Sequence, residues 1–242
     1  MGRRPRGAIP APASGPALQA IQAAPLLKDR AYEALRDAIL RLDLRPGEPL
    51  TERVLAERLG VSKSPIRDGL IRLEQEGLVR STPFKGFEVA GLTPEDMHAV
   101  FEFREAMELY CVEAFVGRAS DARLAELEAT QAHQRRLMEA NEWLRAYEES
   151  RFHQTLVESL ENPVFLAAAR VVQAQLRRIQ NLASTIPGRL AKTHAEHEAV
   201  LHGIRACDVA AAQQAMRVHI RSVLEDTLRS SELRRITSAG VG

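Results

Sequence analysis

The sequence predicts a mainly α-helical protein in two parts, and three observations lead to this prediction. Apolar residues recur at helical spacing along most of the 242 residues, and proline, glycine or capping side chains mark most of the expected helix ends. Short runs of β-forming residues occur only between residues 78 and 92. Hydrophobic residues make up 45% of the chain, which is enough to build two modest cores.

The first helices are marked by spacing and by turn residues. Residues 27–42 are expected to form an amphipathic helix, because apolar residues recur there at helical spacing. The sequence RPGEP at 45–49 ends this helix with a turn. Thr51 stands where it can cap a second helix, and Gly60 supplies the left-handed residue that ends it.

A third helix and a small hairpin follow. Ser62 is expected to cap the helix, Pro65 lies in its first turn, where a missing N–H does little harm, and Gly77 ends it. Two β-type runs, Leu78–Arg80 and Phe87–Val89, are joined by a turn that contains proline and glycine. The order of these elements predicts a winged helix-turn-helix domain over residues 26–91.

The rest of the chain is predicted to be helical. Thr93 and Pro94 mark a strong helix start, and residues 92–235 contain almost no strand signal. We therefore expect an all-α bundle of six to seven helices, with helices at roughly 94–118, 121–140, 142–161, 163–184, 187–206 and 208–234.

Charge and composition limit the partners. Residues 1–90 contain 15 Lys and Arg against 11 Asp and Glu, a net of +4, whereas the remainder contains 18 against 21, a net of −3. This asymmetry indicates different partners for the two parts. No apolar run approaches the roughly 18–20 residues of a membrane span, so no membrane partner is expected.

The cysteines and the ends of the chain complete the first assignment. Cys111 and Cys207 stand alone in the sequence, which favours reduced thiols in a cytoplasmic protein over a disulfide framework. Residues 1–25 are expected to form a disordered tail, because prolines interrupt them and they lack an apolar core. Residues 236–242 are expected to be a frayed end.

The third helix meets the requirements of a helix that enters the major groove: donors at its N-terminal end, cations beside it and an apolar face that fixes it. Taken singly, each arginine is more simply a solvated surface charge. The complete helix-turn-helix-wing order favours double-stranded DNA as the partner. We expect DNA contacts from Arg36 of the first helix, from Ser62, Lys63, Ser64, Arg67 and Arg72 of the third, and from Lys85 and Gly86 of the wing.

The stretch GEPLTERVLAERLGVSKSPIRDGLIRLEQEGLVRSTPFKGFEV, residues 47–89, resembles the DNA-binding domain of the GntR family of bacterial transcription regulators. The resemblance implies a transcription regulator. One departure is Asp68-Gly69, where the family usually has Glu-Ala. Gly69 is expected to cost about 1 kcal/mol of helix propensity relative to alanine and to loosen the helix locally.

Histidines and one glutamate form a second constellation. Glu149 and His153 are four residues apart, which predicts one helical face, and His197 and His219 lie on two later predicted helices. Taken alone, each histidine is more simply a surface or satisfied core residue. Three imidazoles and a carboxylate that meet inside a bundle would suit a divalent transition metal.

The region from Thr93 to about Arg229 is similar to the ligand-binding FCD domain of the FadR subfamily of that family. The resemblance implies metal ligands at Glu149, His153, His197 and His219, although the family usually has Asp in place of Glu149. Zinc is the first choice of metal, with nickel or manganese as alternatives. Arg104 matches a family arginine that would pair with an anionic effector, although a structural ion pair fits equally well.

The resulting hypothesis is a homodimer that binds a palindromic operator and responds to a small organic acid at a metal-containing pocket. Two alternatives stay open from the sequence. The three histidines and the carboxylate would also suit a metal-dependent enzyme. A regulator of the same family with an apolar, acyl-CoA-type pocket would need no metal.

Overall fold

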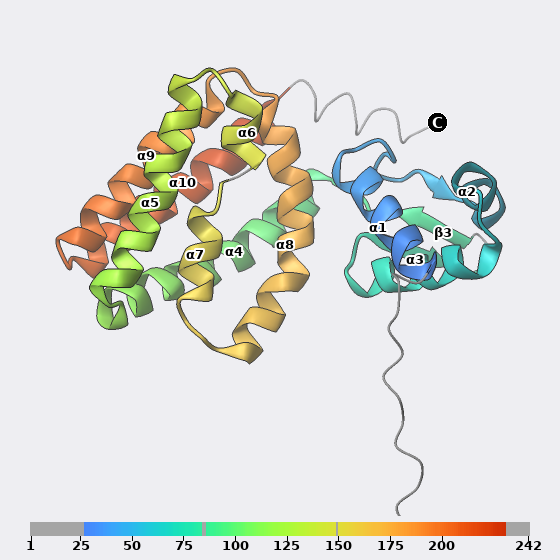
Figure 1. The fold of residues 1–242 in the computed structure, drawn as a ribbon, viewed down its shortest axis with the longest axis horizontal. Helices are drawn as coiled ribbons and strands as arrows, with labels where there is room; N and C mark the ends of the chain where they lie inside the picture. Colours follow the sequence, from blue (N-terminus) through green and yellow to red (C-terminus); the bar gives the residue numbers. More distant parts are fainter. Residues whose placement is uncertain (1–26, 84–85, 149, 231–242) are drawn as a thin grey trace, which may run out of the picture.

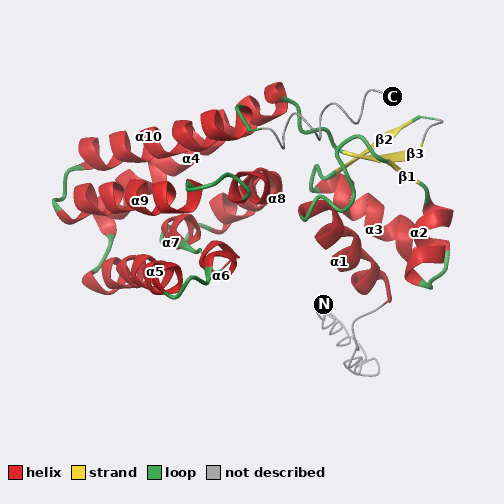
Figure 2. Cartoon of the chain, turned by 90° about the horizontal axis from the view of Figure 1, so that it is seen from above, coloured by secondary structure: helices red, strands yellow, loops and turns green. Residues whose placement is uncertain are grey.

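The structure, a computed structural model, describes residues 27–83, 86–148 and 150–230. The two predicted tails, Lys85 and Glu149 lie outside the described residues. Figure 1 shows a small N-terminal domain beside a larger helical bundle, and the turned view in Figure 2 separates the same two bodies. None of the helices described combines the length and the apolar character that crossing a lipid bilayer requires.

The N-terminal domain has the predicted winged helix-turn-helix order. Its three-stranded antiparallel sheet has the strand order β1-β3-β2, so the short strand β1, which the sequence did not predict, completes the wing. A core of buried apolar residues joins the sheet to the helices. The elements are α1 (Leu27–Leu40), β1 (Pro49–Leu50), α2 (Glu52–Leu59), α3 (Lys63–Gln75), β2 (Val79–Thr82) and β3 (Gly86–Val89).

The helix ends of this domain depend on glycine more than on capping side chains. Gly60 and Gly77 have φ angles of 65° and 69°, in the left-handed region that glycine adopts without strain. Thr51 and Ser62 occupy the expected N-cap positions, but neither side chain makes a cap hydrogen bond, so the predicted capping is wrong in this respect.

Gly69 has a packing role that the sequence did not reveal. Helix α3 runs without interruption through this residue, which is buried. A Cβ atom added at Gly69 would lie 3.3 Å from the Cα atom of Tyr32 in α1. The absent side chain therefore lets α1 and α3 approach closely, and the helix is not broken at this point.

The C-terminal domain is an all-α bundle of seven described helices around one large apolar core. A capping box between Thr93 and Asp96 starts the first of them, as the sequence predicted. The helices are α4 (Pro94–Arg118), α5 (Asp121–Glu139), α6 (Trp143–Glu148), α7 (Phe152–Glu158), α8 (Pro163–Ser184), α9 (Arg189–Arg205) and α10 (Val209–Leu228).

The predicted helix over residues 142–161 is wrong. The chain forms the short helices α6 and α7 there, and Arg151 precedes α7 with non-helical angles of φ −118° and ψ 4°. His153 therefore lies on a helix that begins at Phe152, and the residues just before it, Ser150 and Arg151, are not helical. Apolar periodicity continues across the break, so this signal could not reveal it.

Helix α8 belongs to the bundle and lies against the N-terminal domain (Figure 1). Ala174 packs within the N-terminal core. Arg178 donates to the carbonyl oxygen of Ala90 at 2.7 Å, and Asn181 donates to that of Leu40 at 2.5 Å. Arg178 is fully buried, and burial lowers its pKa to about 10. One side of α8 is thus bonded to the backbone of the N-terminal domain.

Candidate functional site

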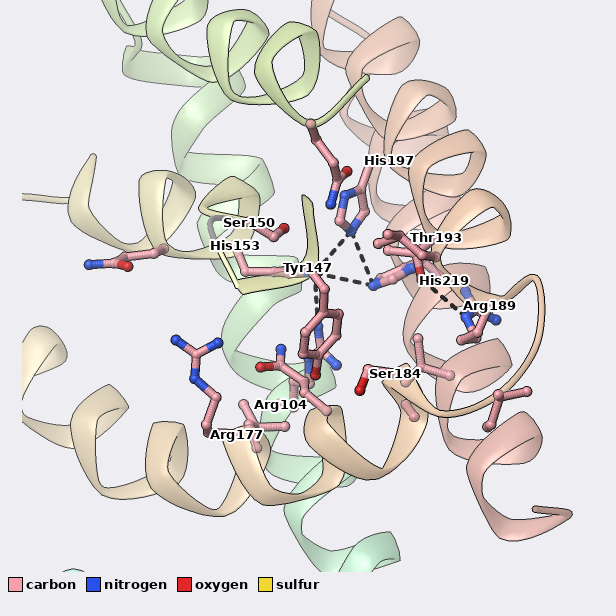
Figure 3. A pocket seen from close by; sticks show the side chains of 18 of the residues that line it. Arg104, Tyr147, Ser150, His153, Arg177, Ser184, Arg189, Thr193, His197 and His219 are labelled. Atoms are coloured by element: carbon pink, nitrogen blue, oxygen red, sulfur yellow. Dashed lines mark hydrogen bonds between the residues drawn. The ribbon is translucent and has the colours of Figure 1, made fainter. Parts of the chain in front are cut away.

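Three histidines from three helices of the bundle meet at one point. His153 lies on α7, His197 on α9 and His219 on α10 (Figure 3). Their Nε2 atoms are 3.0 Å apart between His153 and His197, 3.2 Å apart between His153 and His219, and 3.4 Å apart between His197 and His219. The last two histidines are 1% exposed, so the cluster is buried within the bundle.

Two glutamates hold two of the rings. The Nδ1 atom of His153 lies 2.7 Å from an oxygen of Glu108, and that of His219 lies 2.8 Å from an oxygen of Glu196. A carboxylate accepts hydrogen bonds, so each Nδ1 is assigned the proton and each Nε2 the lone pair. This hydrogen-bonding pattern is common behind histidines that bind metals.

His197 is held differently. Its ring stacks on Phe152, with the centroids 4.2 Å apart and the planes 12° from parallel. Its Nδ1 atom is buried and has no hydrogen-bond partner among the described residues. The ring can carry its proton on only one nitrogen when neutral.

The three Nε2 atoms converge with too few protons between them, although Arg104 donates to that of His153 at 2.9 Å. His197 can donate a proton to one of the two neighbouring lone pairs, and at least one close N···N contact has no proton in it. Burial lowers the pKa of all three imidazoles, and neighbouring imidazoles lower those of His197 and His219 further. Neutral rings with converging lone pairs are what a divalent metal requires.

The distances also fit a metal. Zinc–nitrogen bonds of about 2.0–2.1 Å place neighbouring ligand nitrogens about 2.8–3.4 Å apart at bond angles between right-angled and tetrahedral. The three observed separations lie within this range. Among the described residues, these three histidines form the one group whose ligand atoms all lie within 4.8 Å. Glu149 is outside the described residues, so its predicted coordination is untested.

Arg104 lies at the histidine cluster. Its side chain is 2% exposed and bonds to Glu108 at 2.8 Å, and another of its nitrogens lies 2.9 Å from Nε2 of His153. Burial raises the pKa of Glu108, but Arg104 and His153 together lower it below its usual value. Arg104 therefore forms the structural ion pair that the sequence left open, and it also lines the adjoining cavity.

A cavity of about 750 Å³ opens beside the cluster. All three histidines, Arg104 and Glu108 line one part of it, and residues of α6 and α8 line another. Its size and its mixture of apolar walls and a few polar groups are typical of small-molecule sites.

Sequence reasoning missed the two carboxylates that orient the rings. Glu108 follows Arg104 by one helical turn, and this spacing was the signal that could have found it. Glu196 directly precedes His197 but serves His219, so only the packing of α9 against α10 reveals it. His194 and His202 stay outside the cluster.

A second candidate site lies at the N-terminal end of α3. Ser62, Lys63 and Ser64 are exposed there. The Arg67 side chain is 67% exposed, and its nearest acidic oxygen, in Glu52, is 4.0 Å away. Gly86 begins β3 in the wing with a φ of 84°. These side chains are accessible to a large partner such as DNA.

Lys85 lies outside the described residues, and the remaining two predicted DNA contacts form ion pairs within the protein. Arg36 pairs with Glu76 at 3.4 Å. Arg72 lies over the ring of Tyr32, 3.6 Å from its centroid, and pairs with Asp29 at 3.5 Å. Both arginines thus join α1 to the C-terminal end of α3, whereas the acidic neighbour of Arg67 is Glu52 of α2.

Comparison with known proteins agrees with both halves of the structure. Residues 27–89 match the bacterial regulatory proteins of the gntR family, and residues 99–222 match the FCD domain. An uncharacterised HTH-type transcriptional regulator of Streptomyces ambofaciens is 32% identical over 82% of this chain and 84% of its own. The HTH-type transcriptional repressor GlaR of Escherichia coli is 26% identical over 78% of this chain and 90% of its own.

Solved structures show the same fold. A GntR transcriptional regulator from Rhodococcus sp. RHA1 superposes with a TM-score of 0.67 at 21% identity, over 83% of this chain and 97% of that one. These families and relatives are transcriptional regulators, which excludes the enzyme that the sequence left as an alternative. The chain belongs to the GntR family of bacterial transcription regulators and carries an FCD domain behind its DNA-binding domain.

Proposed function

We propose that this regulator holds a divalent metal ion, with zinc preferred over nickel or manganese, at His153, His197 and His219, and that a small organic acid binds there. Acid binding changes the affinity of a homodimer for a palindromic operator. The observation that carries the proposal is the convergence of three Nε2 atoms 3.0–3.4 Å apart, at least one pair of which has no proton between them.

The bound ion would supply a Lewis-acidic centre to which a carboxylate oxygen can coordinate. Glu108 and Glu196 keep the rings of His153 and His219 in the tautomer that leaves Nε2 unprotonated, and the ion would take the His153 lone pair that faces Arg104 in this structure. Arg104, already beside His153, donates hydrogen bonds to the acid. The three histidines that line one part of the cavity favour a metal-bound acid over the acyl-CoA alternative.

Helix α8 provides the link between the pocket and the DNA-binding domain. Leu176, Arg177 and Gln180 line the cavity, while Arg178 and Asn181 bond to the backbone of residues 90 and 40. An acid that shifts α8 therefore shifts the DNA-binding domain. Two recognition helices of a dimer must lie about 34 Å apart to read successive major grooves, so a small rotation changes affinity.

On the DNA side, Ser62, Lys63, Ser64 and Arg67 contact base edges and nearby phosphates. Their position at the exposed N-terminal end of α3 supports this role, because that end of a recognition helix enters the major groove. Gly86 brings the wing close to the neighbouring phosphate backbone.

The test combines metal analysis with two measurements on the full-length protein. Purified protein should contain about one zinc ion per chain, and chelation should lower its melting temperature until zinc is returned. In a screen of organic acids, at least one acid should then change the affinity of the protein for the promoter region beside its own coding region. Protein that lacks metal and responds to none of the three ions in melting temperature contradicts the proposal.

A further inference from the structure

The part of the cavity away from the histidines has its own polar wall. Helix α8 turns Gln173, Arg177, Gln180 and Ser184 towards the cavity, at spacings of four, three and four residues. Such spacing places these four side chains on one face of a helix. Trp143, Leu144 and Tyr147 of α6 line the same cavity, and Figure 3 shows Arg177, Tyr147 and Ser184 around it.

Arg177 differs from the other two arginines in the cavity lining. Arg104 is paired with Glu108, and Arg189 is paired with Glu196 and Asp226. Arg177 forms no ion pair with any acidic residue of the described ranges. Its charge is therefore available to a ligand.

Tyr147 supplies a second unused group. Its hydroxyl is buried and has no hydrogen-bond partner within the part of the chain that the structure describes. Burial raises the pKa of Tyr147, while the nearby positive charges of Arg177 and Arg104 act in the opposite direction. A tyrosine hydroxyl is protonated at neutral pH, so Tyr147 can donate a hydrogen bond to a ligand in the cavity that it lines. A buried polar group without a partner is rare in folded proteins and calls for a ligand or water.

We infer that Arg177 and Tyr147 form a second acid subsite, and that the effector is a dicarboxylate. One carboxylate binds at the histidine cluster beside Arg104, as the proposed function requires, and the other accepts hydrogen bonds from Arg177 and the Tyr147 hydroxyl. This inference rests on the proposed function for the first carboxylate only.

The position of Arg177 gives the second carboxylate a direct effect on DNA binding. The next residue, Arg178, donates to the backbone oxygens of Ala90 and Gly91, where the wing joins the bundle. A dicarboxylate held at both ends therefore fixes α8 relative to the metal site. A monocarboxylate leaves the α8 end free.

The test compares dicarboxylates from succinate to suberate with the monocarboxylate of equal chain length, from butyrate to octanoate. Calorimetric titration uses full-length protein loaded with zinc. One dicarboxylate should bind about tenfold or more tightly than its monocarboxylate partner, because charge-assisted hydrogen bonds contribute this much. Arg177→Gln should remove the difference between the two series, and Tyr147→Phe should reduce it by a smaller factor.

The control is Arg170→Gln. Arg170 is an exposed arginine two turns earlier on α8 and outside the cavity lining, so this variant should keep the difference in affinity between dicarboxylate and monocarboxylate. Equal binding of both series, still dependent on zinc, overturns the second subsite and leaves the proposed function intact. A difference that survives Arg177→Gln also overturns it. Failure of every acid to bind, with or without zinc, overturns the proposed function and this inference with it.

Discussion

The two candidate sites of this regulator are built in opposite ways. The N-terminal end of α3 presents consecutive residues, exposed to solvent, on a single helix. The histidine cluster joins residues 44 and 22 positions apart, from three helices, with two of the three rings almost fully buried. A surface site of this kind depends on its own side chains, whereas the buried site depends on helix packing and on partners behind the ligands. Substitutions at the two sites should therefore differ in the size of their effects and in the property that they change.

The largest effect is expected from His197→Ala. Loss of one of the three imidazoles should weaken zinc binding by more than about 100-fold, because altering only an outer partner already costs about 10- to 100-fold. Competition with a chelator of known affinity measures the change. His202→Ala, an exposed histidine on the same helix, is the matched control and should bind zinc normally. Equal zinc affinities of the two variants would show that His197 is not a metal ligand.

The next effect concerns the packing that brings two of the histidines together. A Cβ atom at Gly203 of α9 would lie 2.6 Å from the backbone nitrogen of Ala212 in α10. Gly203→Ala should therefore destabilise the fold by about 1–3 kcal/mol. The loss should lie near the upper end of this range, because the backbone of α10 must move. The substitution should also weaken zinc binding. Thermal and urea unfolding measure the first effect.

Gly117→Ala is the control for this change, since nothing lies within 4 Å of the added atom. It should leave stability unchanged or raise it by up to about 1 kcal/mol through helix propensity. Similar unfolding midpoints for the two variants would mean that α9 and α10 can separate without loss.

An intermediate effect is expected from Glu196→Gln. The amide keeps the shape of the side chain but loses the charge that binds Nδ1 of His219 and Arg189. Zinc affinity should fall by about 10- to 100-fold, again by chelator competition. Glu198→Gln, on the same helix and paired with Arg135 at the surface, should change it little. A loss confined to Glu198→Gln would contradict the assigned orientation of His219.

The smallest effect is expected at the exposed site. Arg67→Ala should weaken specific operator binding by about 1–3 kcal/mol, in the lower half of that range because Arg67 is largely exposed. Arg36→Ala should change DNA affinity less, since Arg36 pairs with Glu76. Fluorescence anisotropy on operator and unrelated duplexes measures both variants. Equal loss on all sequences, with a smaller salt slope, would make Arg67 a phosphate contact.

Much of the fold could be predicted because its signals are local. Pro94, Asp121 and Pro163 mark the starts of α4, α5 and α8 at the predicted residues. The winged helix-turn-helix order was likewise confirmed, apart from β1. Strand β1 is only two residues long and forms by pairing with β3, residues 86–89. No local sequence pattern could therefore predict it.

The amino-acid sequence by itself determined where most helices begin and end, which helix end carries the polar residues, and which histidines are candidates to bind a metal. Capping, turn formation and apolar periodicity act within a few residues, and this is why they can be read along the chain.

Only the tertiary structure decided that Glu108 and Glu196 stand behind the rings, that the chain breaks between α6 and α7, and that one face of α8 lines the cavity while the other holds the DNA-binding domain. These features arise where distant segments pack together. The distances and the hydrogen-bond partners they depend on exist only in the folded chain.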